Sequence, residues 1–225
     1  MTPKRSWRIA TLAAAGGVLL VAALTLFVLQ CAGVFDEVQY STPETGTAFN
    51  VSTLATAPAG TPVTGSGPPI ARLVIPAIGV DAAVIVRGIG ADGVMQVPDN
   101  ARDVAWYDFT AHPGSGGNVV FSGHVDFHGV GPAVFWDLGK LTQDDGIEVR
   151  LEDGTSYHYR VTEKGVYNAA DAPVDRIVGQ TPVESVTIIT CTGKFDASTR
   201  QYDKRLVVRA ELASAPPAPA ATAVP

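Results

Sequence analysis

The chain has 225 residues, with 16 Lys and Arg against 22 Asp and Glu, and a formal net charge of −6. This length suits one moderate domain with accessory segments, and the mild acidity excludes the basic field that nucleic-acid binding requires. The two cysteines are Cys31 and Cys191, so the part expected to fold carries one thiol and no internal partner for it.

An uncharged, apolar stretch occupies residues 9–35, and Lys4, Arg5 and Arg8 precede it. About 20 apolar residues are enough to cross a bilayer, so this stretch predicts a transmembrane anchor. Because positive charges favour the cytoplasmic side, residues 1–8 are expected in the cytoplasm and the remainder outside, as in a single-pass protein of the cell membrane. A cleaved signal peptide is the alternative, since small residues are plentiful.

Two segments have compositions that cannot bury enough apolar surface to fold. In the first, Thr, Ala, Gly, Pro and Ser dominate from residue 41 onward, so residues 36–69 are predicted to form a flexible stalk. Residues 214–225 are rich in Ala and Pro and are predicted to be a disordered tail. The folded module is therefore expected to span residues 70–213.

Short runs of branched apolar residues, each followed by turn residues, recur through this module. They predict strands at residues 72–76, 84–86, 117–124, 147–151, 155–161, 186–190 and 205–208. Asp153-Gly154 between two alternating runs is a strong hairpin signal, and residues 171–179 are expected to include a short helix. Many short strands with turns between them predict an all-β fold, a closed or nearly closed β-barrel.

Cys191 follows one branched run, and Arg205 opens the next after a polar, glycine-containing loop. If the two strands pair, a thiol and a guanidinium can share one side of a sheet, where the cation stabilises the thiolate. Taken alone, however, each residue is more often a buried structural cysteine or a solvated arginine.

His124 ends a branched strand in the same way as Cys191, so the two strand ends can bring an imidazole and a thiol into one cleft. An imidazole there can serve as a general acid or base near neutral pH. Asp126, two residues further on, lies on the same side if the strand continues, and either orients the imidazole or is a surface carboxylate. His158 is expected on a sheet face and His112 in an exposed loop.

Metal binding is the competing use of these groups. His124 and His128 are four residues apart, and Cys191 is a possible third ligand. That spacing suits a helix, which Asp126, Gly129 and Gly131 disfavour here.

Several motifs together resemble the sortase family. These are Gly123-His124 after an apolar strand, Thr187-Ile188-Ile189-Thr190-Cys191 for the T-L-x-T-C motif, Lys204-Arg205-Leu206-Val207-Val208 for the arginine-bearing last strand, and the opening strand from Ala71 to Val80. The resemblance covers about residues 70–212. Thr192-Gly193-Lys194-Phe195-Asp196 is similar to the C-G-G-x-F-D stretch of an actinobacterial class (class E/F-like), with Thr192 in place of a glycine, so the subclass stays open.

The resemblance implies an eight-stranded β-barrel and a cysteine transpeptidase. No cofactor or metal site is predicted, and a calcium requirement stays open. Cys191 would attack the Thr–Gly bond of an LPxTG-like sorting signal, His124 would shuttle the proton, and Arg205 would stabilise the oxyanion, with Arg200 as the rival arginine. Thr190, Arg200 and Asp126 are the predicted substrate-binding residues. The implied partners are surface-protein or pilin substrates and an amine acceptor, either a peptidoglycan cross-bridge or a pilin lysine.

Two other functions stay open from the residues alone. One is a non-catalytic, extracellular β-barrel binding module on a membrane stalk, and the other is the metal-binding module described above. The intact set of His124, Cys191 and Arg205 argues against the first of these.

Overall fold

The branched runs of the sequence form strands throughout residues 67–214, the part of the chain that the computed structural model describes. In chain order the elements, with η marking a short 3-10 helix, are β1 (Ile70–Ile75), η2 (Pro76–Ile78), β2 (Val80–Arg87), β3 (Val104–Tyr107), β4 (Asn118–Ser122), β5 (Asp126–Phe127), β6 (Gly131–Pro132), η3 (Leu138–Lys140), β7 (Gly146–Leu151), β8 (Ser156–Asn168), α2 (Val174–Val178), β9 (Ser185–Asp196) and β10 (Gln201–Ser214).

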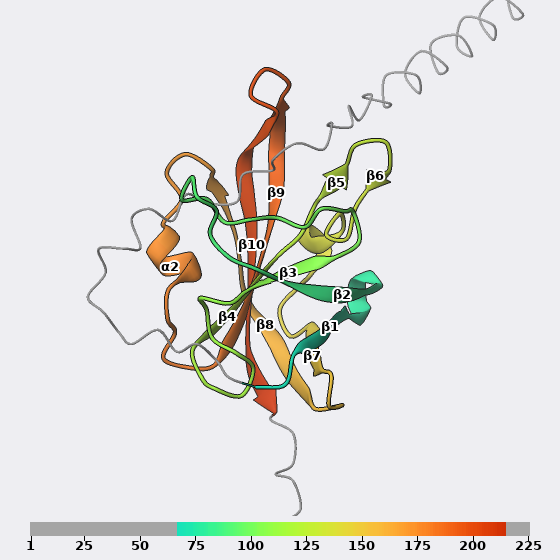
Figure 1. The fold of residues 1–225 in the computed structure, drawn as a ribbon, viewed down its shortest axis with the longest axis vertical. Helices are drawn as coiled ribbons and strands as arrows, with labels where there is room; N and C mark the ends of the chain where they lie inside the picture. Colours follow the sequence, from blue (N-terminus) through green and yellow to red (C-terminus); the bar gives the residue numbers. More distant parts are fainter. Residues whose placement is uncertain (1–66, 215–225) are drawn as a thin grey trace, which may run out of the picture. The chain divides into compact units, whose positions relative to one another are not determined.

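Eight of these strands close into a barrel in the order β1-β2-β3-β4-β9-β10-β8-β7, and β7 pairs back onto β1 (Figure 1). The β2–β3 and β4–β9 pairs are parallel, whereas the long β8, β9 and β10 pair antiparallel. β5 and β6 form a separate two-stranded sheet. The predicted all-β barrel of eight strands is therefore confirmed.

The barrel strands carry apolar side chains on both faces. One buried cluster, which includes Val186 and Ile188 of β9, fills the interior. A second, which we name the outer cluster, consists of Met95, Ala105, Tyr107, Val120, Ile177, Val178, Ile189 and Val207. Because side chains alternate along a strand, Cys191 lies on the same face of β9 as Ile189, outside the barrel interior.

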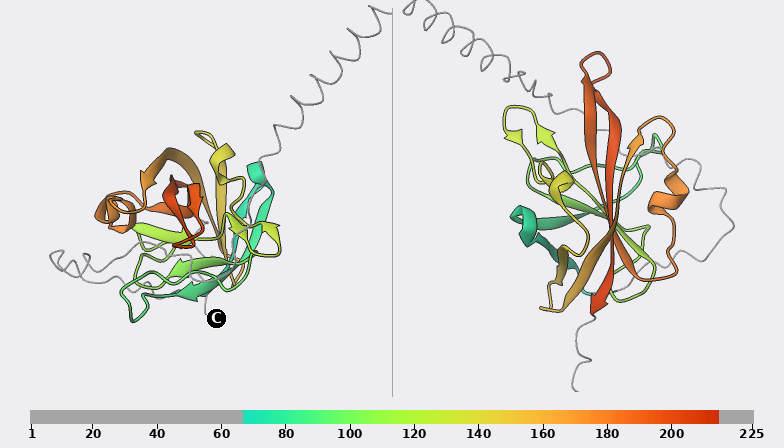
Figure 2. Two further views of the ribbon diagram at one scale, coloured as in Figure 1. Left: turned by 90° about the horizontal axis from the view of Figure 1, so that it is seen from above. Right: turned by 180° about the vertical axis from the view of Figure 1, so that it is seen from behind.

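The strand that carries Cys191 is longer than the sequence suggests. β9 continues to Asp196 and β10 begins at Gln201, so Cys191 and Arg205 lie within strands rather than at their ends. The prediction of a loop directly after Cys191 is therefore wrong. The polar residues there pair across a hairpin that projects from one end of the barrel (Figures 1 and 2), where the Phe195 and Tyr202 rings pack with centroids 5.2 Å apart.

Of the other elements, the predicted hairpin and short helix are confirmed, whereas three short strands were not predicted. The β7–β8 hairpin turns at Asp153-Gly154 as expected, and α2 lies within residues 171–179. Sequence reasoning missed the four-residue β3 and the two-residue strands β5 and β6.

The predicted cytoplasmic N-terminus, the anchor at residues 9–35, most of the stalk at 36–69 and nearly all of the tail at 214–225 lie outside the described residues. Within residues 67–214, none of the helices has the length and apolar character needed to cross a membrane.

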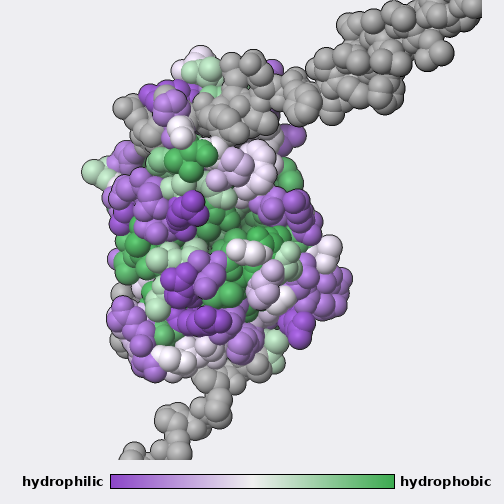
Figure 3. All heavy atoms as spheres, turned by 90° about the vertical axis from the view of Figure 1, so that its right-hand side faces the viewer, coloured by the Kyte–Doolittle hydropathy of each residue, from purple (hydrophilic) through white to green (hydrophobic). Residues whose placement is uncertain are grey.

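One side of the barrel exposes some apolar surface. Viewed from the right of Figure 1, apolar residues gather in the middle of this face, and hydrophilic residues border them (Figure 3). Over the described residues, the large apolar side chains that are exposed include Val130, at 56%, and Trp136, at 41%. Apolar surface of this kind is typical of places where a protein contacts a ligand or partner.

Candidate active site

Cys191 and Arg205 are direct partners in the antiparallel ladder between β9 and β10. Directly opposed residues of an antiparallel pair place their side chains on one face of the sheet, close together. The Arg205 side chain is buried, at 4% exposure, and its Nη1 donates to the carbonyl oxygens of Tyr202 at 2.9 Å and Lys204 at 3.0 Å. The guanidinium is therefore held in place beside the thiol.

His124 reaches the same place from β4. In the parallel β4–β9 pair Ser122 lies beside Ile189, and the Gly123 N–H donates to the Ile189 carbonyl oxygen at 3.3 Å. The Thr190 hydroxyl donates to the Gly123 carbonyl oxygen at 2.8 Å. His124 comes directly after Gly123, just past the end of the β4–β9 ladder, and Cys191 comes directly after Thr190. These two bonds therefore tie the segment that carries His124 to the part of β9 that carries Cys191, the partner of Arg205.

The His124 ring has a defined orientation. Its Nε2 lies 2.8 Å from the carbonyl oxygen of Pro98, and its ring packs edge-on against Phe127 with centroids 5.2 Å apart. Because a carbonyl oxygen only accepts hydrogen bonds, Nε2 carries the proton of the neutral imidazole. Nδ1 is then the atom that can take up and return a proton during a reaction.

The thiol of Cys191 has a raised pKa. Burial is the largest cause, because it disfavours the charged thiolate, and the negative charge of Asp126 acts in the same direction. The positive charge of Arg205 opposes both and lowers the pKa. The resting sulfur is therefore mostly a neutral thiol near pH 7, and attack on a carbonyl requires that its proton be removed.

Asp126 is buried, at 6% exposure, and its Oδ2 accepts a hydrogen bond of 2.7 Å from the Tyr202 hydroxyl. The alternative of a surface carboxylate is therefore wrong. The assumption that its strand continues from His124 is also wrong, because β4 ends at Ser122 and Asp126 begins the separate strand β5. Sequence reasoning missed Tyr202, which lies in a segment expected to be a loop.

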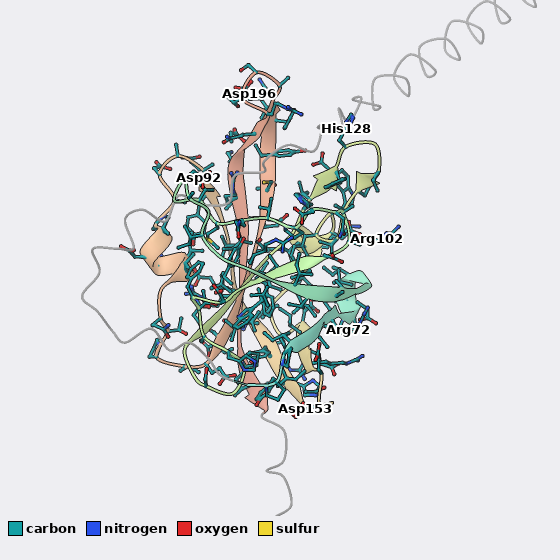
Figure 4. All side chains as sticks on the ribbon, in the orientation of Figure 1. Arg72, Asp92, Arg102, His128, Asp153 and Asp196 are labelled. Atoms are coloured by element: carbon teal, nitrogen blue, oxygen red, sulfur yellow. The ribbon has the colours of Figure 1, made fainter. Side chains whose placement is uncertain are left out.

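Arg200 lies in the connection of the projecting hairpin, where its φ of 58° is left-handed. The next residue, Gln201, pairs with Asp196, which Figure 4 shows at the outer end of this hairpin. At ~3.3 Å per residue, Asp196 is about 16 Å along β9 from Cys191. The ladder therefore favours Arg205 over Arg200 as the partner of the thiol.

The other residues singled out in the sequence are Thr190, His158 and His112, and the structure gives the burial of each. The Thr190 side chain is buried, at 3% exposure, and bonded to Gly123, so it braces the His124 segment, while its substrate-binding role stays a prediction. His158 is exposed on β8, as expected for a sheet face. The expectation that His112 is exposed is wrong, because its ring is buried at 4% between the carbonyl oxygens of Pro68 and Pro113.

The metal hypothesis combined His124, His128 and Cys191. Figure 4 shows His128 at the outer turn of the β5–β6 hairpin. Residues 67–214 contain no group of three or more His, Cys, Asp and Glu side chains placed to hold a metal ion.

Gly123 is required by the packing around His124. A Cβ at this position would come within 2.7 Å of the Phe135 ring and of Val134 Cγ1, and the Phe135 N–H donates to the His124 carbonyl oxygen at 2.9 Å. Gly123→Ala therefore displaces the segment that holds His124. We expect a loss of about 1–3 kcal/mol in the free energy of unfolding, as for other overpacked sites, and a lower kcat/KM at temperatures where the variant stays folded.

Gly146→Ala is the matched control, because a Cβ at Gly146 meets no atom within 4 Å. Thermal melts and peptide kinetics on both variants make the comparison. Wild-type kinetics in a folded Gly123→Ala variant would contradict the role given to this glycine.

Known proteins share this architecture. A family model described as the sortase domain matches residues 73–213, well over half of the chain. Sortase C-1 from Actinomyces oris is 25% identical, with a TM-score of 0.51 over 65% of this chain and 75% of that chain. Sortase A from Corynebacterium diphtheriae, in a lid mutant, is 23% identical, with a TM-score of 0.50 over 68% and 74% of the two chains. No curated protein sequence matches significantly.

The barrel and its family match define a cysteine transpeptidase. The chain belongs to the sortase family.

Proposed function

We propose that this sortase cleaves an LPxTG-like sorting signal between Thr and Gly and transfers the acyl group to an amine. The observation that carries the proposal is the direct pairing of Cys191 with Arg205. The hydrogen bond from the Gly123 N–H to the Ile189 carbonyl oxygen holds the segment of His124 beside the same strand. An acyl-transfer site needs a nucleophile, a proton shuttle and a cationic or N–H clamp for the oxyanion. These three residues supply one group for each role.

In the first half of the reaction the Cys191 thiol passes its proton to His124 Nδ1, and the thiolate attacks the carbonyl carbon of the threonine. The carbonyl oxygen becomes an oxyanion, which the Arg205 guanidinium stabilises. The C–N bond to glycine then breaks, and the imidazolium returns its proton to the leaving amine. A thioester between Cys191 and the threonine is left on the enzyme.

In the second half an acceptor amine attacks the thioester carbonyl, and His124 removes the amine proton. Collapse of the second tetrahedral intermediate expels the Cys191 thiolate and forms a new amide bond. The proposed acceptor is an amine of a peptidoglycan cross-bridge or a pilin lysine, and the proposed donors are surface proteins or pilins that carry the sorting signal.

The proposal is tested by trapping the thioester. The purified full-length chain is incubated with a library of Leu-Pro-x-Thr-Gly peptides, and its intact mass is measured. We expect an adduct ending at threonine that Cys191→Ala lacks and that an added amine discharges. Absence of an adduct with every peptide, or an adduct that persists in Cys191→Ala, would favour a non-catalytic binding module.

We also propose that the catalytic domain is held outside the cell by a single-pass anchor at residues 9–35. The charge order across this segment and its length support the proposal. Membrane fractions of cells that make the chain should contain it at full mass, and externally added protease should digest it in intact cells. Recovery of a shortened chain in the medium would instead indicate a cleaved signal peptide.

A further inference from the structure

Tyr202 contacts both charged groups that act on the Cys191 sulfur. Its hydroxyl donates to Asp126 Oδ2 at 2.7 Å, and its main-chain carbonyl oxygen accepts from Arg205 Nη1 at 2.9 Å. Asp126 and Tyr202 are 76 residues apart in sequence, and their bond joins the β5–β6 hairpin to the projecting β9–β10 hairpin. Figures 1 and 2 show both hairpins at the same end of the barrel.

Asp126 and Arg205 act on the sulfur in opposite directions. Arg205 lowers the pKa of the Cys191 thiol and Asp126 raises it. A donor bonded to the carboxylate offsets part of its negative charge, so the Tyr202 hydroxyl weakens the opposition of Asp126 to the thiolate. Tyr107 of β3 is a further titratable group near the sulfur, because the negative charge of Cys191 helps to raise its pKa. The His124 segment follows the end of β4.

We propose that Tyr202 is a positioning residue of the active site, whose hydroxyl holds Asp126 and whose carbonyl holds Arg205 against the reactive sulfur. The residue acts through these two groups. It also connects the conformation of the projecting hairpin to the nucleophile, because Tyr202 packs on Phe195 within that hairpin. This inference rests on the proposed function in taking Cys191 as the nucleophile.

The test measures how fast iodoacetamide alkylates Cys191 as a function of pH, by mass spectrometry, in full-length protein with Cys31→Ala as background. Tyr202→Phe removes only the hydroxyl and keeps the ring on Phe195 and the carbonyl on Arg205. We expect it to raise the thiol pKa and slow alkylation at pH 7 severalfold. Asp126→Asn removes the opposing charge, so it should lower the thiol pKa and speed alkylation at pH 7 severalfold.

The double variant Tyr202→Phe/Asp126→Asn tests whether the Tyr202 hydroxyl acts on the thiol through Asp126. If Tyr202 acts through Asp126, adding Tyr202→Phe to Asp126→Asn should leave the alkylation curve of Asp126→Asn in place. Tyr157→Phe is the matched control, because Tyr157 lies near the far end of β8 from Tyr167, the residue that pairs with Arg205. It should behave as the background protein does.

Three results would overturn the inference. They are an unchanged curve in folded Tyr202→Phe, an equal slowing by Tyr202→Phe when Asp126 is already Asn, and a slower reaction in Asp126→Asn. The last applies even if Tyr202→Phe fails to fold. Alkylation needs no sorting signal, so these outcomes are independent of the thioester experiment that tests the proposed function.

Discussion

Replacing His124 with Gln is expected to lower kcat/KM for a sorting-signal peptide by about 10²–10⁴, the usual contribution of a positioned general acid–base. Glutamine keeps an amide N–H that can donate to the Pro98 carbonyl oxygen, which accepts from His124 Nε2 at 2.8 Å. It has no titratable nitrogen to take the proton of the Cys191 thiol, whose raised pKa keeps it protonated near neutral pH. The loss should therefore come from proton transfer and not from the fold.

Steady-state kinetics and thermal melts on the same preparations separate these two causes. His158→Gln is the matched control, since His158 is exposed on β8 and pairs with Glu148 and Ser214 away from Cys191. It should keep wild-type kinetics. A His124→Gln variant with wild-type kcat/KM would remove the imidazole from the mechanism and leave another group to be found for the proton.

The parts of the site that sequence reasoning anticipated are those that local patterns encode. A short branched apolar run bounded by turn residues is typical of a buried strand, and a reactive residue next to such a run is held in a rigid position. This logic located His124, Cys191 and Arg205. The local pattern could not predict that Arg205 pairs with Cys191, because this pairing depends on the register of two strands across a hairpin, which only the structure gives.

The extent of β9 illustrates a limit of local patterns. Thr192, Gly193 and Lys194 have the composition of a loop, yet β9 runs through them and pairs with β10. Gly193 has a φ of +88°, and a Cβ there would lie 2.2 Å from Asp203 Oδ1. The pairing also shifts register between Tyr202 and Lys204. A glycine is therefore suited to the irregular pairing of β9 with β10 at this point. The contact between Phe195 and Tyr202 across the hairpin cannot be predicted from the sequence of either strand alone.

Asp126 and His112 illustrate a second limit, which is burial of polar groups. Both precede turn-rich sequence, and both are buried by contacts with distant segments, Tyr202 for Asp126 and Pro68 for His112. Polar side chains are usually exposed, and burial costs free energy unless a hydrogen bond compensates. Since the compensating partners come from other parts of the chain, only the folded structure shows that these residues are inside.

Replacing Arg205 with Met is expected to lower kcat/KM by about 10²–10³, as for loss of an oxyanion donor elsewhere. Methionine keeps an unbranched apolar stem of similar course, so it limits the cavity left in a site that is 4% exposed. The variant has a second, independent signature. Because the charge of Arg205 lowers the pKa of Cys191, its removal should raise that pKa and slow iodoacetamide alkylation near pH 7.

Arg200→Met tests the rival assignment in the same assays. Arg200 precedes the Gln201–Asp196 pair, whereas Arg205 pairs with Cys191 itself, so Arg200→Met should leave the alkylation curve near wild type. Any loss of kcat/KM through its predicted substrate-binding role should be much smaller than the loss in Arg205→Met. Arg205→Lys keeps the charge but loses the planar fork, so it should preserve more of the alkylation rate than of kcat/KM. If instead Arg200→Met caused the large loss and Arg205→Met did not, the projecting hairpin would have to fold back over the thiol during the reaction.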